Sequence, residues 1–511
     1  MESLDDKTWD TVICGTGLQQ SLLALALSRS DKRILHLDKN DYYGEHEAAL
    51  SLQEAESFAK AYARDRDAQQ LSEGAMETQR TAIFRNASVW KNSNAEAKGL
   101  SLSRAYSLAL APQIIHTRSQ LLSQLVTSRA YRQVEFLAVG SFFVYDASAS
   151  EPNAKLARIP SSREDVFSTK AIPVRAKRSL MKFLKFVMDY DSEEQKLVWQ
   201  DHGESLLTEF LSSQFGLDES LRQYILALTL TLDGKVKVRE GLASIHRHLA
   251  SIGLFGPGFC AVYPKWGGLS EIAQVACRAQ AVGGGIYMLD HGYEVDVSNE
   301  DPEIALKLSS GITVRTNHLI SAQQDVEPGS RMITRLVAIV NAPLKHVFEA
   351  TVEGAPNPAV AIIAFPSGAF SGSDSTTPVY AFVHHSDTGE CPTGQSVIYL
   401  TTLSSSGAPQ RLEKALDALL QMSMTLAPQA PSCLFKLLYE QYAGKCSSSP
   451  NKSTSMFEFP APSFGLAFDD SCLDAVKDAW NHVTGDSTND DQYMIFQDRE
   501  SVGDDDDEVF E

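Results

Sequence analysis

The sequence predicts an α/β fold with one large domain built on mixed sheets and a smaller all-helical domain inserted in the chain. At the start, the apolar run 10–14 leads through a glycine turn into a helix, and 33–38 forms a second strand. Amphipathic helical patterns then follow one another between 161 and 233. From 311 to 439, β-branched and aromatic runs recur, which is typical of strands. Strand patterns on both sides of a helical segment indicate a discontinuous α/β domain.

The glycine turn is the clearest motif in the chain. Gly15 and Gly17 stand between an apolar strand and a helix, and Asp38 ends the next strand. This layout is typical of the βαβ unit that binds FAD or NAD(P). Gln20 replaces the third glycine, so a long polar side chain stands where helix and strand should nearly touch. The residues alone predict a degenerate dinucleotide site and leave open an impaired or unusual cofactor site.

Helical periodicity is strongest in the middle of the chain. One apolar stripe has the spacing i, i+3, i+4 and i+7 and consists of Leu180, Phe183, Leu184 and Val187. This spacing indicates the core of a small helical domain. A domain rich in Met and Phe can also open to hold a lipid chain, because methionine-lined surfaces repack easily. The segment is basic in an acidic protein, which suits a solvated face, an acidic partner or a membrane surface.

These patterns give a domain division. The region after the βαβ unit has few large apolar residues and weak periodicity, so we expect a mobile insertion with partial helix there. The expected parts are a discontinuous α/β domain over 1–47, 104–160 and 234–485, a mobile insertion over 48–103, a helical domain over 161–233, and an acidic disordered tail over 486–511.

Charge and composition exclude some functions. The formal net charge is -20, and the segment from Asp486 to Glu511 holds eleven acids and one arginine. Such acidity argues against binding to nucleic acid, because phosphate binding needs clustered Lys and Arg. The seven cysteines form no CxxC pair, which favours a reducing compartment. The acidic start of the chain lacks a signal-peptide core, so we expect a cytoplasmic protein.

Residues with catalytic or metal-binding potential are sparse. His246 and His248 should point to different faces of a helix, and His384 and His385 should alternate across a strand. Neither pair predicts a metal site, and we expect no bound metal. We find no GxSxG elbow and no phosphate-binding P-loop. We interpret Cys14 and Cys277 as small packing residues, with a cysteine nucleophile as the alternative. No catalytic constellation is predicted.

Several segments together resemble the family of Rab GDP-dissociation inhibitors and Rab escort proteins. The glycine turn and the stretch 35–44, which ends Asp-Tyr-Tyr-Gly, are similar to that family's first conserved region. The stretch 263–274, then Cys277-Arg278 and 284–289, resembles its second. The resemblance covers about three quarters of the chain and fails in the 48–103 insertion and the acidic tail. It departs at Leu254, where an arginine is expected, and in the turn 266–270, which is one residue longer.

The resemblance implies a fold similar to that of flavin-dependent oxidases, without a bound flavin or other cofactor. It further implies that Tyr43, Glu271, Arg278 and Met288 form a platform for GDP-bound Rab GTPases. An aromatic anchor, a charged pair and a flexible methionine suit a protein-binding hot spot. From the residues alone, Glu271 and Arg278 could instead form a local pair, and Met288 could belong to the core.

Within the family, the insertion and the extended tail favour an escort protein over a recycling inhibitor. The resemblance then implies a non-catalytic accessory protein that presents Rab to the heterodimeric geranylgeranyltransferase and shields the geranylgeranyl groups. The helical domain, with the stripe from Leu180 to Val187, is the candidate contact for the lipid or the transferase. Delivery of the product implies transient membrane contact. A Rab GDP-dissociation inhibitor and an FAD-dependent oxidoreductase are the alternatives.

Overall fold

The computed structural model describes most of the chain. The described residues are 4, 8–63, 83–147, 149, 155–160, 166, 172–296, 303–323, 330–350, 353–370, 377–424, 430–444, 451–461, 465–485 and 492–497. Residues 161–165 of the expected helical domain, and 486–491 and 498–511 of the expected acidic tail, lie outside them. Within this part of the chain, no helix is both long and apolar enough to cross a membrane.

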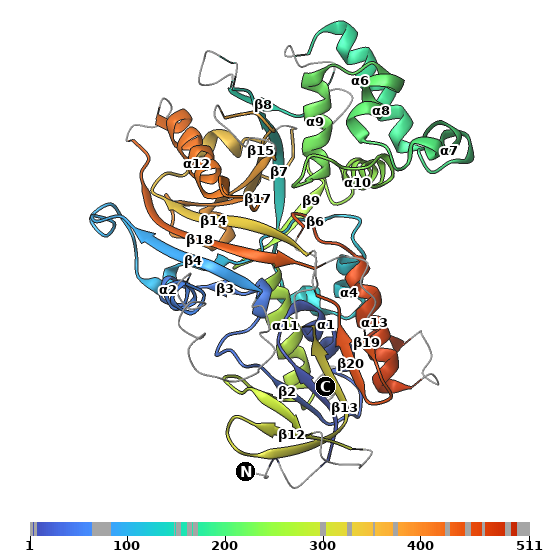
Figure 1. The fold of residues 1–511 in the computed structure, drawn as a ribbon, viewed down its shortest axis with the longest axis vertical. Helices are drawn as coiled ribbons and strands as arrows, with labels where there is room; N and C mark the ends of the chain where they lie inside the picture. Colours follow the sequence, from blue (N-terminus) through green and yellow to red (C-terminus); the bar gives the residue numbers. More distant parts are fainter. Residues whose placement is uncertain are drawn as a thin grey trace, which may run out of the picture.

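The first sheet lies in the lower half of Figure 1 and is mixed. Its main path has the order β10-β2-β1-β13-β12-β11, and β20 joins β13 to β19. The pairs β10–β2, β2–β1 and β1–β13 are parallel, whereas β12 pairs antiparallel with both β11 and β13. The strands are β1 Thr8–Cys14, β2 Ile34–Leu37, β10 Ile286–Met288, β11 Tyr293–Asp296, β12 Ile304–Leu308, β13 Thr313–Ala322, β19 Asn451–Lys452 and β20 Met456–Phe459.

A second, larger sheet crosses the centre of Figure 1 and is mostly antiparallel. Its order is β4-β18-β14-β17-β16-β15-β7-β9-β6, and β8 pairs with β7. A separate two-stranded sheet pairs β3 Ala49–Leu50 antiparallel with β5 Leu108–Ala109. The strands of the larger sheet are β4 Phe84–Lys91, β6 Ile115–His116, β7 Phe136–Tyr145, β8 Leu156–Arg158, β9 Ala261–Pro264, β14 Arg331–Val340, β15 Val360–Phe365, β16 Val379–His385, β17 Ser396–Leu403 and β18 Cys433–Ala443.

Helices cover the sheets. All ten residues of α1 are buried, because α1 packs against α11 and α13 as well as against the first sheet. On the second sheet, α12 packs against β14, β16 and β17. These contacts confirm a large α/β unit with mixed sheets. The helices are α1 Leu18–Leu27, α2 Leu52–Ala61, α4 Gln120–Thr127, α11 Leu269–Val282, α12 Ala408–Met424 and α13 Ser471–Thr484.

A separate helical lobe stands at the upper right of Figure 1. Its helices share one apolar core, as expected for an inserted helical domain. The core extends past the expected boundary at 233, because Val238, Leu242 and Ile245 of α10 are buried within it. The lobe's helices are α6 Val174–Met188, α7 Glu193–Trp199, α8 Leu207–Phe215, α9 Glu219–Thr229 and α10 Val238–Ser251.

The mobile insertion expected over 48–103 is wrong for its described parts. Here α2 and β4 are ordered elements, and β4 is the edge strand that pairs with β18. Phe58 and Phe84 are buried and meet edge to face at 5.0 Å. The few large apolar residues of this region are enough to order α2 and β4, because they pack into a core that distant segments mainly build. Residues 64–82 lie outside the described part.

The expectation of a disordered tail over 486–511 also needs correction. Residues 492–497 are described and pack back onto the first sheet's helices. Met494 and Phe496 are buried, and the amide of Phe496 donates to the carbonyl O of Thr127 (3.0 Å). The guanidinium of Arg29 lies 4.7 Å from the ring centre of Phe496. Two apolar side chains within an acidic segment thus find partners in the tertiary fold.

Candidate functional site

The predicted strand–turn–helix unit forms at the carboxyl end of β1. Gly15 has a φ of +93°, a left-handed conformation that favours glycine. Its amide donates to the carbonyl O of Leu37 at 2.7 Å, and its own carbonyl O lies 2.6 Å from Nε2 of His36. The turn therefore has the backbone of a dinucleotide-binding motif.

The chain's own carboxylates fill the space beside this turn. Glu45 and Glu47 belong to a 3-10 turn, Glu45–Glu47. A Cβ built on Gly15 would lie 2.6 Å from both carboxylate oxygens of Glu45. The amide of Leu18, at the first residue of α1, donates to Oε2 of Glu47 at 3.3 Å. The N-terminus of a helix after such a turn is where a dinucleotide's pyrophosphate binds, and here two carboxylates take that position.

Gln20 takes part in the same arrangement. Its side chain is buried, and Nε2 donates to Oε2 of Glu45 at 3.1 Å and to the carbonyl O of Cys14 at 3.5 Å. The large polar residue thus bridges strand and carboxylate. Asp38 is also engaged within the protein, since Oδ2 accepts from the amide (2.8 Å) and the hydroxyl (2.5 Å) of Thr16. In a dinucleotide site this acid would instead bind a ribose hydroxyl.

Burial changes the ionisation of the three acids at the turn. Burial, together with the nearby Asp38, raises the pKa of Glu45 to about 8. Burial also raises the pKa of Glu47 to about 7 and that of Asp38 above its usual value. Whether protonated or ionised, the carboxyl groups of Glu45 and Glu47 occupy the space beside Gly15 and the amide of Leu18 that a pyrophosphate would need. The residues present therefore do not fit FAD or NAD(P).

Tyr43 lies beside α11 and β10. Its ring centre is 6.2 Å from that of Tyr287, which in turn stacks on His36 at 4.7 Å. Burial raises the pKa of the half-exposed Tyr43, and the nearby Cys277 of α11 adds to the effect. The structure therefore places Tyr43 against the segment that carries Arg278.

Glu271 and Arg278 both lie on α11. They are seven residues apart, so they project from the same side of the helix two turns from each other. Arg278 is exposed and Glu271 half-buried. Burial raises the pKa of Glu271, and the charge of Arg278 opposes this shift. The two side chains therefore form an accessible charged stripe that runs past Tyr43.

Met288 is separated from this stripe. It lies on β10, where successive side chains point to opposite faces of the sheet. Tyr287 faces His36, whereas Met288 packs against the cluster that contains Leu35 and Leu37. The structure thus brings Tyr43 to α11 and leaves Met288 half-buried at the sheet's other face. Alternation along a strand three residues long was not used in the sequence prediction and would have separated them.

The turn before α11 exposes an aromatic side chain that the sequence prediction did not assign to a site. Trp266 has an exposed fraction of 52% and a φ of +73°. Its amide donates to the carbonyl O of Thr388 (2.8 Å), and its own carbonyl O accepts from the hydroxyl of Ser107 (2.8 Å). A Cβ on Gly389 would come within 2.3 Å of the Trp266 ring. The turn thus presents a large ring next to the start of α11.

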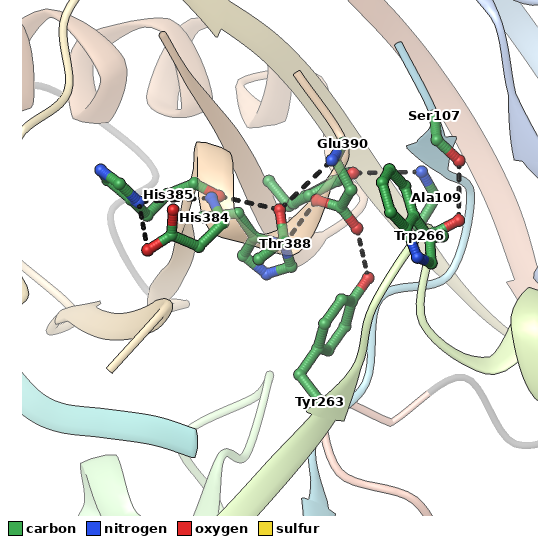
Figure 2. Close-up of polar contacts among 10 residues, drawn as sticks. Ser107, Ala109, Tyr263, Trp266, His384, His385, Thr388 and Glu390 are labelled. Carbon is green, nitrogen blue, oxygen red and sulfur yellow. Dashed lines mark hydrogen bonds and ion pairs between the residues drawn. The ribbon is translucent and has the colours of Figure 1, made fainter. Parts of the chain in front are cut away.

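A polar network lies beside this turn, as Figure 2 shows. Glu390 accepts from the hydroxyl of Tyr263 at 2.8 Å and from Nδ1 of His384 at 2.7 Å. All three side chains are buried. Because an unpaired buried carboxylate is costly, these hydrogen bonds fix the strand β9 that leads into Trp266. The adjacent histidines of the sequence therefore serve packing, with His384 inside and His385 half-exposed.

The apolar stripe of the helical lobe is mainly core. Leu180, Phe183 and Val187 are buried, and Leu184 is partly buried against the same cluster. These residues were predicted as contacts for a lipid or a transferase, but burial removes three of them from the surface. Among the described residues of the lobe, the exposed large apolar side chains lie outside this stripe: Val174, Met188, Leu197, Val198 and Leu206.

Comparison with known proteins shows the family. The family model described as "GDP dissociation inhibitor" matches residues 5–81 and 74–363, more than half of the chain. The chain therefore belongs to the GDP dissociation inhibitor family, as the resemblance of its segments 35–44 and 263–274 predicted. Among curated relatives, it is 30% identical over 434 residues to a Saccharomyces cerevisiae protein named "Rab proteins geranylgeranyltransferase component A". A Candida albicans protein of the same name is 26% identical over 428 residues.

The matched regions span most of this chain but a smaller share of the relatives' own length. They cover 83% and 80% of the chain, and 66% and 61% of the two yeast proteins. Among solved structures, a Rab GDI from Plasmodium falciparum has a TM-score of 0.64 at 17% identity, covering 94% of this chain and 99% of that one. An oxidoreductase from Methanosarcina mazei has a TM-score of 0.54 at 13% identity, with 92% and 99% covered. These structures confirm the predicted fold class.

Proposed function

We propose that this protein is a Rab escort protein. In this role it binds GDP-bound Rab GTPases, presents them to the Rab geranylgeranyltransferase heterodimer and delivers the prenylated product to membranes. The observation that carries the proposal is the occupied glycine turn, where Glu45 and Glu47 take the place of a pyrophosphate. A fold otherwise suited to a dinucleotide is thus available as a scaffold for protein binding. The names of the yeast relatives support the particular role.

The Rab-binding surface that we propose consists of Tyr43, Trp266, Glu271 and Arg278. Two exposed or half-exposed aromatic rings and a charged pair suit a protein interface. Met288 lies on the opposite sheet face from Tyr287 and takes part at the margin. Trp266 adds an anchor that rests on a rigid turn and so loses little conformational entropy on binding.

For the transferase or the lipid, we propose contact through the helical lobe. Leu197 is 82% exposed and Val174 69% exposed, which suits a surface that is covered in a complex. A geranylgeranyl chain gains about 0.8 kcal/mol per buried methylene, so a membrane must offset that gain before the chain is released. We therefore propose a cytoplasmic protein with transient membrane contact and no catalytic step of its own.

The family model favours a second candidate function within the same class. Its description, GDP dissociation inhibitor, suits a protein that recycles prenylated Rab from membranes. Both functions need the Tyr43 and α11 surface, but the escort function alone needs the transferase. Reconstituted prenylation of a Rab by the purified transferase heterodimer separates them. Omission of an escort protein should abolish product formation, whereas an unchanged rate without this protein rejects the escort function.

Substitutions on the proposed surface test where Rab binds. We expect Tyr43→Ala and Arg278→Ala each to weaken binding of Rab-GDP by about tenfold or more, because truncation of a hot-spot residue costs more than 1 kcal/mol. Titration calorimetry with a GDP-loaded Rab measures the effect. Lys452→Ala, which removes a surface ion pair with Asp478, is the matched control and should bind normally. Unchanged affinity in both test variants rejects this surface.

A further inference from the structure

Three buried side chains with metal-binding atoms meet where the helical lobe joins the second sheet. His116 ends β6, His248 lies on α10, and Cys260 directly precedes β9. Their exposed fractions are 3%, 5% and 4%. One ligand atom from each lies within 4.8 Å of the others. The sequence separates these residues, which is why inspection of neighbouring histidines predicted no metal site.

Hydrogen bonding does not account for this cluster. Neither ring nitrogen of His116 has a hydrogen-bond partner among the described residues. Sγ of Cys260 lies 3.5 Å from Nδ1 of His248, within reach of a weak S–H···N bond, but that bond leaves His116 unsatisfied. A buried imidazole without a partner is costly. The lone pair of a neutral imidazole can be satisfied equally well by a metal ion.

The distances suit a tetrahedral ion. With a Zn–N bond of about 2.0 Å and a Zn–S bond of about 2.3 Å, the nitrogen and sulfur ligands of tetrahedral zinc lie about 3.5 Å apart. Nδ1 of His248 and Sγ of Cys260 already have that separation. A cavity of about 20 Å³ is lined by both residues and by Phe142. It has room for about one water molecule, the usual fourth ligand where three come from the protein.

We propose that His116, His248 and Cys260 bind a Zn²⁺ ion that links α10 to strands β6 and β9. Imidazole and thiolate are the ligands that zinc prefers. On binding, the thiol of Cys260 releases its proton to solvent, and its sulfur forms the bond to zinc. Two hydrogen bonds already link the segment after β6 to the end of α10. Thr117 Oγ1 donates to the carbonyl O of Ser251 at 2.6 Å, and Arg118 Nε donates to the carbonyl O of Ala250 at 2.6 Å. The ion adds a third connection there.

Cobalt binding tests the proposal on the full-length protein. After treatment with a chelator under reducing conditions, the protein should take up one equivalent of Co²⁺ and show both tetrahedral ligand-field bands and a thiolate-to-cobalt charge-transfer band. Zn²⁺ should displace the cobalt and raise the unfolding temperature. An absence of the charge-transfer band in the wild-type protein, or uptake without a fixed stoichiometry, overturns the proposal and leaves the S–H···N bond as the explanation.

Matched variants locate the site. His116→Gln and Cys260→Ser should weaken cobalt binding by at least tenfold and abolish the stabilisation by zinc. His246→Gln, two residues from His248 on the same helix, and Cys472→Ser on α13 should bind like the wild type. Circular dichroism of the metal-free variants checks folding. Binding by the test variants equal to that of the controls rejects these three ligands. The outcome is independent of prenylation activity.

Discussion

At the scale of single residues, Gln20, which replaces the third glycine of the motif, belongs to a hydrogen-bonded group of side chains around the turn. Gln20, Glu45 and Glu47 contact one another or the turn, and Asp38 binds Thr16. Gln20, which would be damaging in a cofactor site, is therefore a hydrogen-bond partner for the half-buried carboxyl group of Glu45. The acids are held at a cost, because burial disfavours their charged forms. That cost predicts how stability depends on pH.

We expect the two glutamates to reduce stability as the pH rises. Their folded-state pKa values, about 8 for Glu45 and about 7 for Glu47, exceed the ordinary value of 4.5. The folded state therefore binds protons more tightly than the unfolded chain, and this contribution is complete below pH 4.5 and lost as the pH passes 7 to 8. Urea unfolding should show Glu45→Gln/Glu47→Gln gaining on the wild type by up to about 1.4 kcal/mol per pH unit for each group.

The exposed Glu96→Gln provides the comparison for this measurement, since Glu96 lies on the surface with 83% of its side chain exposed. Its difference from the wild type should stay constant across the same pH range. A constant difference for the Glu45/Glu47 variant as well contradicts the raised pKa values.

At the scale of elements, the turn before α11 and the helical lobe each combine exposed side chains, which could contact a partner, with buried side chains that hold the element in place. Trp266 is exposed, whereas the network of Tyr263, His384 and Glu390 that holds the turn is buried. In the lobe, Phe183 is core and Leu197 is surface. Paired substitutions distinguish support from contact in both elements.

Gly389→Ala should displace the Trp266 ring. Its Cβ would lie 2.3 Å from that ring, and Gly389 has a φ of +77°. We expect altered tryptophan fluorescence and about tenfold weaker binding of Rab-GDP, similar to Trp266→Ala. Gly394→Ala is the matched control, because its φ is +89° but nothing lies within 4 Å of the new Cβ. It carries the same backbone strain, roughly 1–3 kcal/mol, without contact to Trp266. Equal Rab affinity in the two alanine variants contradicts the role of Trp266.

Phe183→Ala and Leu197→Ser should act differently in the helical lobe. Phe183 is fully buried, so its truncation should lower the free energy of unfolding by about 3–5 kcal/mol. Leu197→Ser should change stability by about 0.5 kcal/mol or less but weaken binding to the transferase. Chemical denaturation and a pull-down with the purified heterodimer measure the two effects. Val126→Ser, at an exposed site on α4, should change neither; loss of transferase binding in that variant removes the argument for the lobe.

At the scale of the whole molecule, residues far apart in sequence complete each local structure. Residues 492–497 cover helices built by the first third of the chain, and β4 from the expected insertion completes the edge of the second sheet. The proposed zinc ligands come from three segments. The space beside the glycine turn is likewise filled from elsewhere in the chain, by the turn Glu45–Glu47 that follows β2.

We therefore expect the purified protein to lack flavin absorption in the visible range, and Gln20→Gly to lack it too. Restoring the third glycine leaves the carboxyl groups of Glu45 and Glu47 beside the turn, where they occupy the position that a pyrophosphate would take. Absorption spectra before and after incubation with FAD measure this. A stoichiometric flavin in either protein favours the oxidoreductase alternative.

The sequence by itself determined the fold class, the family and the degenerate character of the glycine turn. These depend on local patterns, namely apolar periodicity and short motifs such as Gly15-x-Gly17 with Asp38. It also placed Tyr43, Glu271 and Arg278 on segments that the structure brings close together at the surface of α11.

Only the tertiary structure decided which side chains are exposed and what occupies the turn. Leu180, Phe183 and Val187 form a stripe that suits either core or contact, and packing against the other helices buries them. The position of Glu45 against Gly15, the opposite facing of Met288, and the meeting of His116 with Cys260 depend on how distant segments pack. Periodicity reports which face of an element is apolar, but burial depends on the neighbours that the fold supplies.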